Sequence, residues 1–176
     1  MVDLHGRVAI VTGASSGIGR ATALAFAREG MQVVVSDVAV SGGEETVRLI
    51  RENGGEAIFV PCDVSKSEDV QALVRQAVAQ YGRLDFACNN AGIGGESAPT
   101  ADYSEAGWNK VIGINLTGVF LCMKYEIPEI LKQGGGAIVN MASILGHVGF
   151  PAAPAYVAAK HGVIGLTQNA ALEYAK

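Results

Sequence analysis

Three side chains near the end of the sequence could move a proton at an alcohol or carbonyl oxygen. Tyr156 and Lys160 stand four residues apart, and Ser143 lies upstream of them. Residues at i and i+4 share one face of a helix, so the Lys160 ammonium can lie near the Tyr156 phenol and favour its ionised form. An ordinary phenol, with a pKa of about 10, needs such help to act as a base at neutral pH. The spacing alone also fits a chance surface pair, and that alternative stays open here.

A glycine-rich turn, TGASSGIG at 12–19, predicts a phosphate-binding site. Gly13, Gly17 and Gly19 are spaced G-x-x-x-G-x-G between an expected strand and an expected helix. Such glycines allow a tight turn and a close approach to a pyrophosphate, whose charge the helix N-terminus favours. We expect the other residues of the turn to border the nucleotide too, namely Ser15, Ser16 and Ile18. A P-loop is excluded because no Gly-Lys-Ser/Thr follows, and a plain glycine-rich turn is the remaining alternative.

Asp37 predicts which nucleotide the turn would bind. It ends the second expected strand, where a carboxylate can accept hydrogen bonds from an adenosine ribose and would repel a 2′-phosphate. Ser16 and Val38 add no positive charge nearby. The sequence therefore favours NAD over NADP, with a turn-capping role for Asp37 as the alternative.

The elements that must position these residues alternate regularly. Short β-branched runs are expected as strands at 7–12, 32–37, 56–62, 85–90 and 135–143. Helical patterns follow them at 18–30, 41–55, about 65–81, about 103–132 and 154–176, with Ser65 as the expected N-cap of the third helix and Glu68 completing a capping box. This alternation predicts an α/β fold with a doubly wound parallel sheet.

Composition limits the function further. The 176 residues are enough for one domain with a real core, and the net charge of -4 is spread without long runs, so no nucleic-acid partner is expected. No apolar run approaches the roughly 18 residues that span a bilayer, and the first residues do not resemble a signal peptide. We therefore expect no membrane partner and a cytoplasmic location. We also expect no metal, because the histidines are scattered and the cysteines, expected to be reduced and buried, form no C-x-x-C pair: Cys62, Cys88 and Cys122.

Taken together, the motifs resemble the short-chain dehydrogenase/reductase family over essentially the whole chain. Besides the glycine-rich turn and Tyr-x-x-x-Lys, the sequence carries Asp63-Val64 after the third expected strand and Asn-Asn-Ala-Gly at 89–92 after the fourth. The resemblance implies a Rossmann fold with strand order 3-2-1-4-5, forming a single NAD(P)-binding domain over 1–176. It also implies hydride transfer between NAD and an alcohol or ketone.

The resemblance also implies roles for individual residues. Ser143 would bind the substrate oxygen, Tyr156 would exchange its proton, and Lys160 would bind the nicotinamide ribose and support the tyrosine. Asn115 would hold a water that links Lys160 to solvent. Adenine contacts would come from Asp63 and Val64, and the turn after the fourth strand would border the cofactor with Asn90, Ala91 and Gly92.

The end of the sequence departs from the family pattern. Family members continue with a sixth strand and later elements, so we expect an incomplete domain that lacks the C-terminal strands. A fragment of an ordinary enzyme is the favoured interpretation; a short form that binds nucleotide without efficient catalysis and a purely structural or interaction module are the alternatives. Pairing through the long helix and the final helix, as in the family, would give a homodimer or homotetramer.

Overall fold

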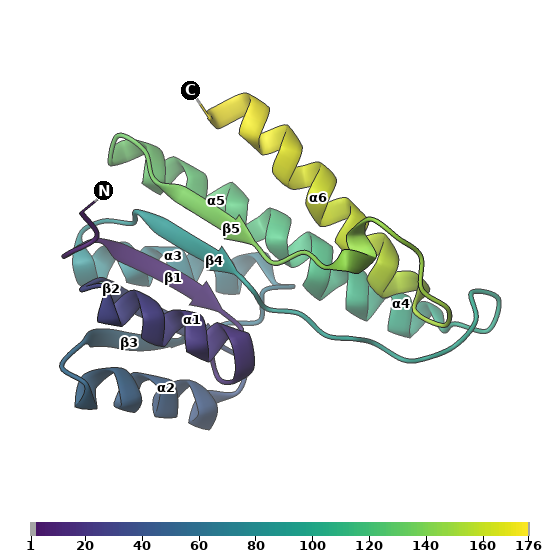
Figure 1. Cartoon of the computed structure of the whole chain (residues 1–176), viewed down its shortest axis with the longest axis horizontal. Helices are drawn as coiled ribbons and strands as arrows, with labels where there is room; N and C mark the ends of the chain where they lie inside the picture. The colour runs from purple at the N-terminus through teal and green to yellow at the C-terminus, as the bar shows by residue number, and fades with distance from the viewer. Residues whose placement is uncertain (1–2, 176) are drawn as a thin grey trace.

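The computed structural model describes residues 3–175, and residues 1, 2 and 176 of the expected domain lie outside that part. Its centre is a five-stranded parallel sheet in the order β3-β2-β1-β4-β5 (Figure 1). This order confirms the predicted doubly wound α/β fold. The strands are β1 (Val8–Thr12), β2 (Gln32–Asp37), β3 (Glu56–Pro61), β4 (Phe86–Asn89) and β5 (Ala137–Asn140).

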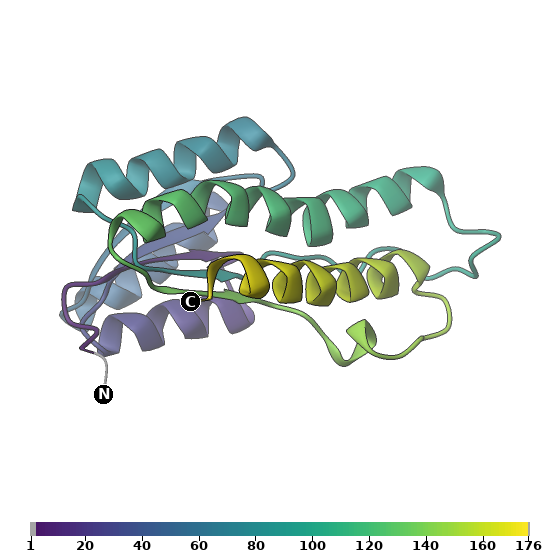
Figure 2. The ribbon, with the colours of Figure 1, turned by 90° about the horizontal axis from the view of Figure 1, so that it is seen from above.

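Helices follow the strands as the periodicity predicts. They are α1 (Gly17–Arg28), α2 (Val40–Glu52), α3 (Ser67–Tyr81), α4 (Glu105–Ile112), α5 (Gly118–Lys132) and α6 (Pro154–Tyr174). The expected long helix at 103–132 consists of α4 and α5 joined by a π-helical segment, η1 (Gly113–Thr117), and a short 3₁₀ turn, η2 (Ile144–Gly146), follows β5. Figure 2 shows α4 and the first half of α6 extending beyond the sheet.

Two layers of helices bury the two faces of the sheet. On one face, α3 and α5 pack against Ile10 and Val34; on the other, α1 and α2 pack against Val11 and Val35. Side chains alternate between the faces of a strand, so a central strand between two helical layers must be apolar throughout. The fully buried valines and isoleucine of β1 meet that demand.

The start of α3 differs from the prediction. Ser65 is not its N-cap: the helix begins at Ser67, after Lys66, which supplies no side-chain cap. The Ser65 hydroxyl instead donates to Asp63 Oδ1 at 2.6 Å, and the Ser65 N–H donates to the same oxygen at 3.1 Å. The Ser65 hydroxyl is therefore bound to the Asp63 carboxylate and does not cap the helix as the predicted capping box requires.

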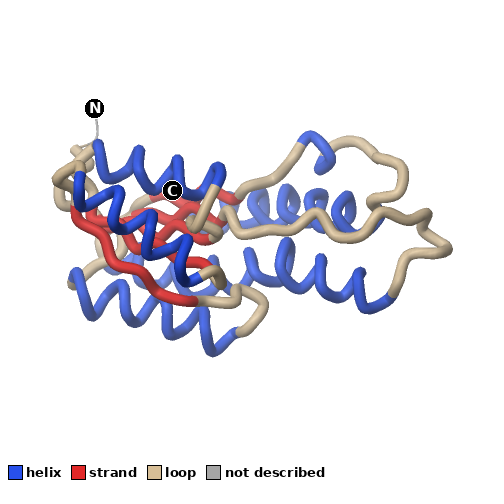
Figure 3. Tube along the Cα trace, turned by 90° about the horizontal axis from the view of Figure 1, so that it is seen from below, coloured by secondary structure: helices blue, strands red, loops and turns tan. Residues whose placement is uncertain are grey.

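The loops that carry the predicted site lie beyond the carboxyl ends of the strands (Figure 3). Across residues 3–175, no helix is long and apolar enough to cross a membrane. Within the same range, no group of three or more His, Cys, Asp or Glu side chains is placed to hold a metal ion. The three cysteines are buried and unpaired, as expected, and burial raises the pKa of the Cys62 thiol to about 12.

Candidate nucleotide and catalytic site

A groove of about 450 Å³ opens at the carboxyl ends of β1 to β4. This is the point at which the chain reverses the direction of strand addition, where open α/β sheets bind their ligands. All but three of the residues predicted to bind the cofactor line it: Gly13, Ser15, Ser16, Gly17, Ile18, Asp37, Asp63, Val64, Asn90, Ala91 and Gly92. Gly19 lies beneath the turn, while Tyr156 and Lys160 lie outside this groove on α6.

Two glycines of the turn meet different demands. A Cβ at Gly13 would lie 2.8 Å from Ala91 Cα, so this glycine lets the turn pack against the loop after β4. Gly17, at the start of α1, has a φ of 52°, and a Cβ there would meet nothing within 4 Å. A side chain at Gly13 would therefore clash with the loop after β4. Gly17 instead faces open space at a helix N-terminus, where a phosphate can approach the free N–H groups.

Asp37 is bound at both carboxylate oxygens. Oδ2 accepts the Ser15 N–H at 3.0 Å, and Oδ1 accepts the Ala39 N–H at 2.9 Å. The second bond caps the turn after β2, so the turn-capping alternative describes part of what this carboxylate does. Each oxygen can accept more than one hydrogen bond, and the carboxylate still borders the groove.

The loop after β4 is tied to the end of β1. The Thr12 hydroxyl accepts the N–H groups of Asn90 and Ala91, each at 3.1 Å, and the Asn90 side chain donates to the carbonyls of Thr12 and Gly13 at 3.0 and 3.1 Å. These bonds hold the floor of the groove in one position.

Asp63 and Val64 form the wall of the groove beyond β3. The pKa of Asp63 is lowered, mainly because the Ser65 hydroxyl donates to its carboxylate, so Asp63 is ionised at neutral pH. Val64 is buried, and a Cβ at Gly118 would lie 2.8 Å from Val64 Cγ2. The first residue of α5 therefore fixes this part of the wall.

Lys160 is a buried cation beside Tyr156. Only 4% of its surface is exposed; its Nζ donates to the Met141 carbonyl at 2.6 Å and lies 5.5 Å from the centre of the Tyr156 ring. Burial lowers the pKa of Lys160, and in such a site a charge interacts with its neighbours more strongly than in water. The predicted i, i+4 pair is thus a packed pair tied to the end of β5 and not an exposed surface pair.

Ser143 stands at the start of η2, which packs on α6. Its Oγ accepts the Leu145 N–H at 3.2 Å, and a Cβ at Gly146 would lie 2.8 Å from the Lys160 carbonyl oxygen. The structure therefore brings the segments that carry Ser143, Tyr156 and Lys160 together, beside the nucleotide groove and outside it.

Asn115 is fully buried in the π-helical segment η1. Its Oδ1 accepts the Ile93 N–H at 2.9 Å, and its Nδ2 donates to the Ile93 carbonyl at 2.8 Å. The side chain thus pairs with both backbone groups of one residue in the loop after β4. π-Helical turns of this kind are frequent at functional sites, and the role of Asn115 in holding a water stays a prediction.

The structure adds residues that sequence reasoning did not single out for the site. Val38, Cys62, Ile93 and Ile114 line the groove, and Thr12, Arg20 and Thr46 hold the glycine-rich turn. Thr12 opens the recognised motif, so its position was a usable signal. Thr46 carries no such signal, because its contacts join elements far apart in the sequence.

Comparisons with known proteins agree with this architecture. A model of the short chain dehydrogenase family matches residues 7–176. Cyclohexanol dehydrogenase of Acinetobacter sp. (strain SE19) is 50% identical over 171 residues, covering 97% of this chain and 68% of that protein. The 2,5-dichloro-2,5-cyclohexadiene-1,4-diol dehydrogenase of Sphingobium indicum is 46% identical over 177 residues, covering 100% of this chain and 70% of that protein.

Solved structures show the same relationship. The crystal structure of NAD⁺-bound xylitol dehydrogenase matches with a TM-score of 0.95 and 39% identity, covering 99% of this chain and 67% of that one. The chain thus spans about two thirds of the length of these relatives. On these grounds, the chain belongs to the short-chain dehydrogenase family of oxidoreductases.

Proposed function

We propose that the chain carries the nucleotide and proton-transfer sites of an NAD-dependent oxidoreductase that acts on a secondary alcohol or the corresponding ketone. The observation that carries this proposal is the buried Lys160 ammonium beside Tyr156, next to the groove at the carboxyl ends of β1 to β4. In this function, residues 1–176 would form one nucleotide-binding domain that is incomplete at its C-terminal side. The cytoplasmic location stays a prediction.

The groove fits NAD at three places. The open position at Gly17 and the N-terminus of α1 suit a pyrophosphate, the Asp37 carboxylate suits an unmodified adenosine ribose, and Asp63 suits the adenine amine. NAD, when bound, supplies the hydride acceptor. The carboxylate at Asp37 would repel a 2′-phosphate, which supports NAD over NADP.

Proton transfer falls to the residues of α6 and η2. In alcohol oxidation, Tyr156 takes the hydroxyl proton, and Lys160 stabilises the phenolate form that accepts it. Ser143 donates a hydrogen bond to the substrate oxygen and orients it. In the reverse direction, Tyr156 returns the proton to the carbonyl oxygen.

Cyclic secondary alcohols are the substrate class to test first. Two relatives are named for cyclohexanol and for a cyclohexadiene diol. The segment after Ser143 exposes apolar side chains that suit such a ring, namely Ile144, Val148 and Phe150.

The first prediction concerns Tyr156→Phe, which removes the exchangeable proton and keeps the ring. We expect turnover of cyclohexanol with NAD⁺, followed by NADH absorbance, to fall by at least about a hundredfold. NADH affinity, measured by calorimetry on the same preparation, should stay within about twofold of wild type. Turnover that survives the substitution would refute the role of Tyr156. NADH binding by a wild-type chain that turns over no alcohol would favour the nucleotide-binding alternative.

A further inference from the structure

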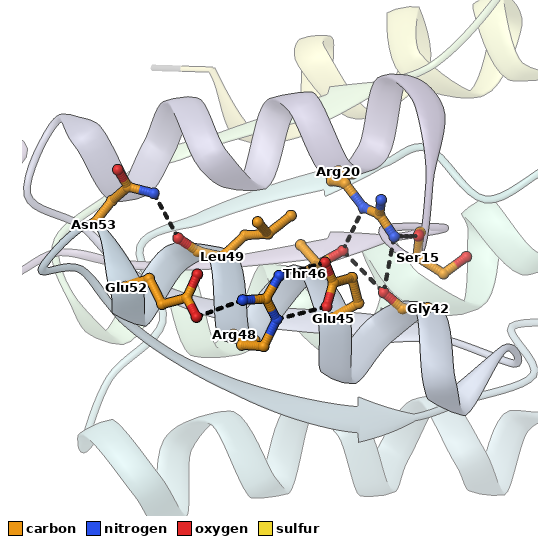
Figure 4. Close-up of polar contacts among 9 residues, drawn as sticks. All are labelled: Ser15, Arg20, Gly42, Glu45, Thr46, Arg48, Leu49, Glu52 and Asn53. Carbon is orange, nitrogen blue, oxygen red and sulfur yellow. Dashed lines mark hydrogen bonds and ion pairs between the residues drawn. The ribbon is translucent and has the colours of Figure 1, made fainter.

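A hydrogen-bond network centred on an arginine lies behind the glycine-rich turn, between α1 and α2 (Figure 4). Arg20 lies in the first turn of α1, and its Nε donates to the Thr46 hydroxyl at 2.9 Å. Its Nη2 donates to the Gly42 carbonyl at 3.2 Å and to the Ser15 carbonyl. A planar fork of donors is suited to hold several acceptors in a fixed arrangement.

Thr46 completes this system from α2. It is fully buried, and its hydroxyl, which accepts from Arg20, lies 2.8 Å from the Ala14 carbonyl oxygen and 3.1 Å from that of Gly42. The hydroxyl has one hydrogen to donate, and the Ala14 carbonyl is the nearer acceptor. Two consecutive carbonyls of the turn, Ala14 and Ser15, are therefore held by Thr46 and Arg20.

The start of α2 packs closely against the glycine-rich turn. A Cβ at Gly42 would lie 2.8 Å from Ser15 Cβ, so the first turn of α2 is in direct contact with Ser15. Hydrogen bonds and van der Waals contacts thus fix the backbone around Ser15 from the α2 side.

The backbone of Ser15 is also held by Asp37. The Ser15 N–H, which shares a peptide group with the Ala14 carbonyl, donates to Asp37 Oδ2 at 3.0 Å, while the Ser15 carbonyl accepts from Arg20. Arg20 and Thr46 do not line the groove, so their effect on the nucleotide passes through the backbone of Ser15.

We propose that Arg20 and Thr46 are positioning residues for nucleotide selection, which hold the backbone on both sides of Ser15 and through it the orientation of the Asp37 carboxylate. This inference rests on the proposed function, in which Asp37 excludes the 2′-phosphate of NADP. A turn released from Arg20 lets the carboxylate rotate, so its repulsion of a 2′-phosphate weakens.

The test compares NADH and NADPH affinities by calorimetric titration of the full chain. Thr46→Val removes the hydroxyl and keeps the shape, and Arg20→Met removes the fork and keeps much of the stem. We expect each to lower the ratio of NADH affinity to NADPH affinity about tenfold. Thr46→Ser, which keeps the hydroxyl, should retain the wild-type ratio.

Arg48→Met is the matched control on α2. Of the residues that the structure describes, Arg48 pairs only with Glu45 and Glu52, whose carboxylates are exposed, and it lies away from the turn (Figure 4). It should leave the ratio unchanged. Thermal unfolding of each variant checks the fold, and the partly exposed Arg20 provides a variant that tests the inference even where the buried Thr46→Val does not fold.

The outcomes separate the two claims. An unchanged ratio in folded Arg20→Met and Thr46→Val overturns the inference and leaves the proposed function standing. A wild-type chain that binds neither nucleotide overturns the proposed function, and the inference falls with it. A lowered ratio in both variants, restored by Thr46→Ser, supports the inference, because a merely structural loss would weaken both nucleotides alike.

Discussion

At the scale of single residues, the open side of Gly17 decides how the nucleotide can approach. Its positive φ disfavours any L side chain, and in the described part of the chain nothing lies within 4 Å of the place its Cβ would take. The prominent glycine spacing of the sequence was enough to predict such a position. It could not separate Gly17 from Gly13, because the loop that approaches Gly13 lies far away in the sequence.

We predict that Gly17→Val lowers NADH affinity at least about a hundredfold, because the new side chain fills the approach to the α1 N-terminus. Gly54→Val is a matched control: Gly54 has a φ of 79°, also faces open space, and follows the end of α2, away from the groove. Both substitutions should cost about 1–3 kcal/mol of stability through backbone strain. Equal NADH affinity in the two folded variants would show that Gly17 does not face the nucleotide.

Residues that act through side-chain partners were harder to predict. The Tyr156–Lys160 spacing indicated a pair, but the Met141 carbonyl that receives the lysine came only from the packing of α6 on the end of β5. The prediction that Ser65 is the N-cap of α3 was wrong, because the Ser65 hydroxyl binds the Asp63 carboxylate instead. Local sequence patterns describe neighbours along the chain. The hydrogen-bond partners of Lys160 and of Ser65 depend instead on which acceptors lie near them in the folded protein.

At the scale of elements, a polar chain passes through the core between α5, β4, β5 and α6. Asn89 donates to Glu126 Oε2 at 3.0 Å and to Asn140 Oδ1 at 3.1 Å, and Asn140 donates to the Thr167 hydroxyl at 2.9 Å. Glu126 is fully buried, and its Oε1 has no hydrogen-bond partner among residues 3–175. The element boundaries were largely predictable from periodicity; this chain was not, because it joins four elements through single side chains.

Burial raises the pKa of Glu126 to about 7 from an ordinary 4.5, against the Asn89 bond, which lowers it. Between pH 4.5 and about pH 7, the Glu126 carboxyl stays protonated in the folded state but is ionised in the unfolded state. Its contribution to the free energy of unfolding is therefore fully present below pH 4.5 and is lost as the pH rises through about 7. We predict that Glu126→Gln, which cannot ionise, gains about 3 kcal/mol relative to wild type between about pH 4 and about pH 8. Chemical denaturation at both pH values measures this difference.

The comparison between the two proteins removes the titration of all other shared groups. Glu129→Gln is a matched control on α5, because Glu129 pairs with Lys132 near the surface. Its difference from wild type should change little with pH. A flat difference for Glu126→Gln as well would mean that Glu126 ionises in the folded protein as readily as in the unfolded chain.

At the scale of the whole molecule, apolar side chains remain exposed along the long helix. Trp108 on α4 and Phe120 and Leu131 on α5 are each at least 40% exposed. Burial of such side chains against a second copy would remove apolar surface from water, which agrees with the homodimer or homotetramer expected from the family resemblance. The sequence alone does not show what covers these side chains. An apolar helix face has the same residue pattern whether it packs against its own chain or against a second copy.

We predict that sedimentation of the wild-type chain shows a concentration-dependent dimer or tetramer and that Phe120→Glu shifts it toward monomer. Val40→Glu, at an exposed apolar position on α2, is the control and should leave the assembly unchanged. A wild-type monomer across a broad concentration range would count against pairing through these helices.

Nucleotide binding in the groove at the carboxyl ends of β1 to β4 is measured by a parallel calorimetric titration of the chain with NADH and NADPH. The groove and the Asp37 carboxylate predict that NADH binds and that NADPH binds at least about tenfold more weakly. Binding of neither nucleotide would mean that the groove is not a dinucleotide site, and NADPH binding as tight as NADH binding would mean that Asp37 does not exclude the 2′-phosphate.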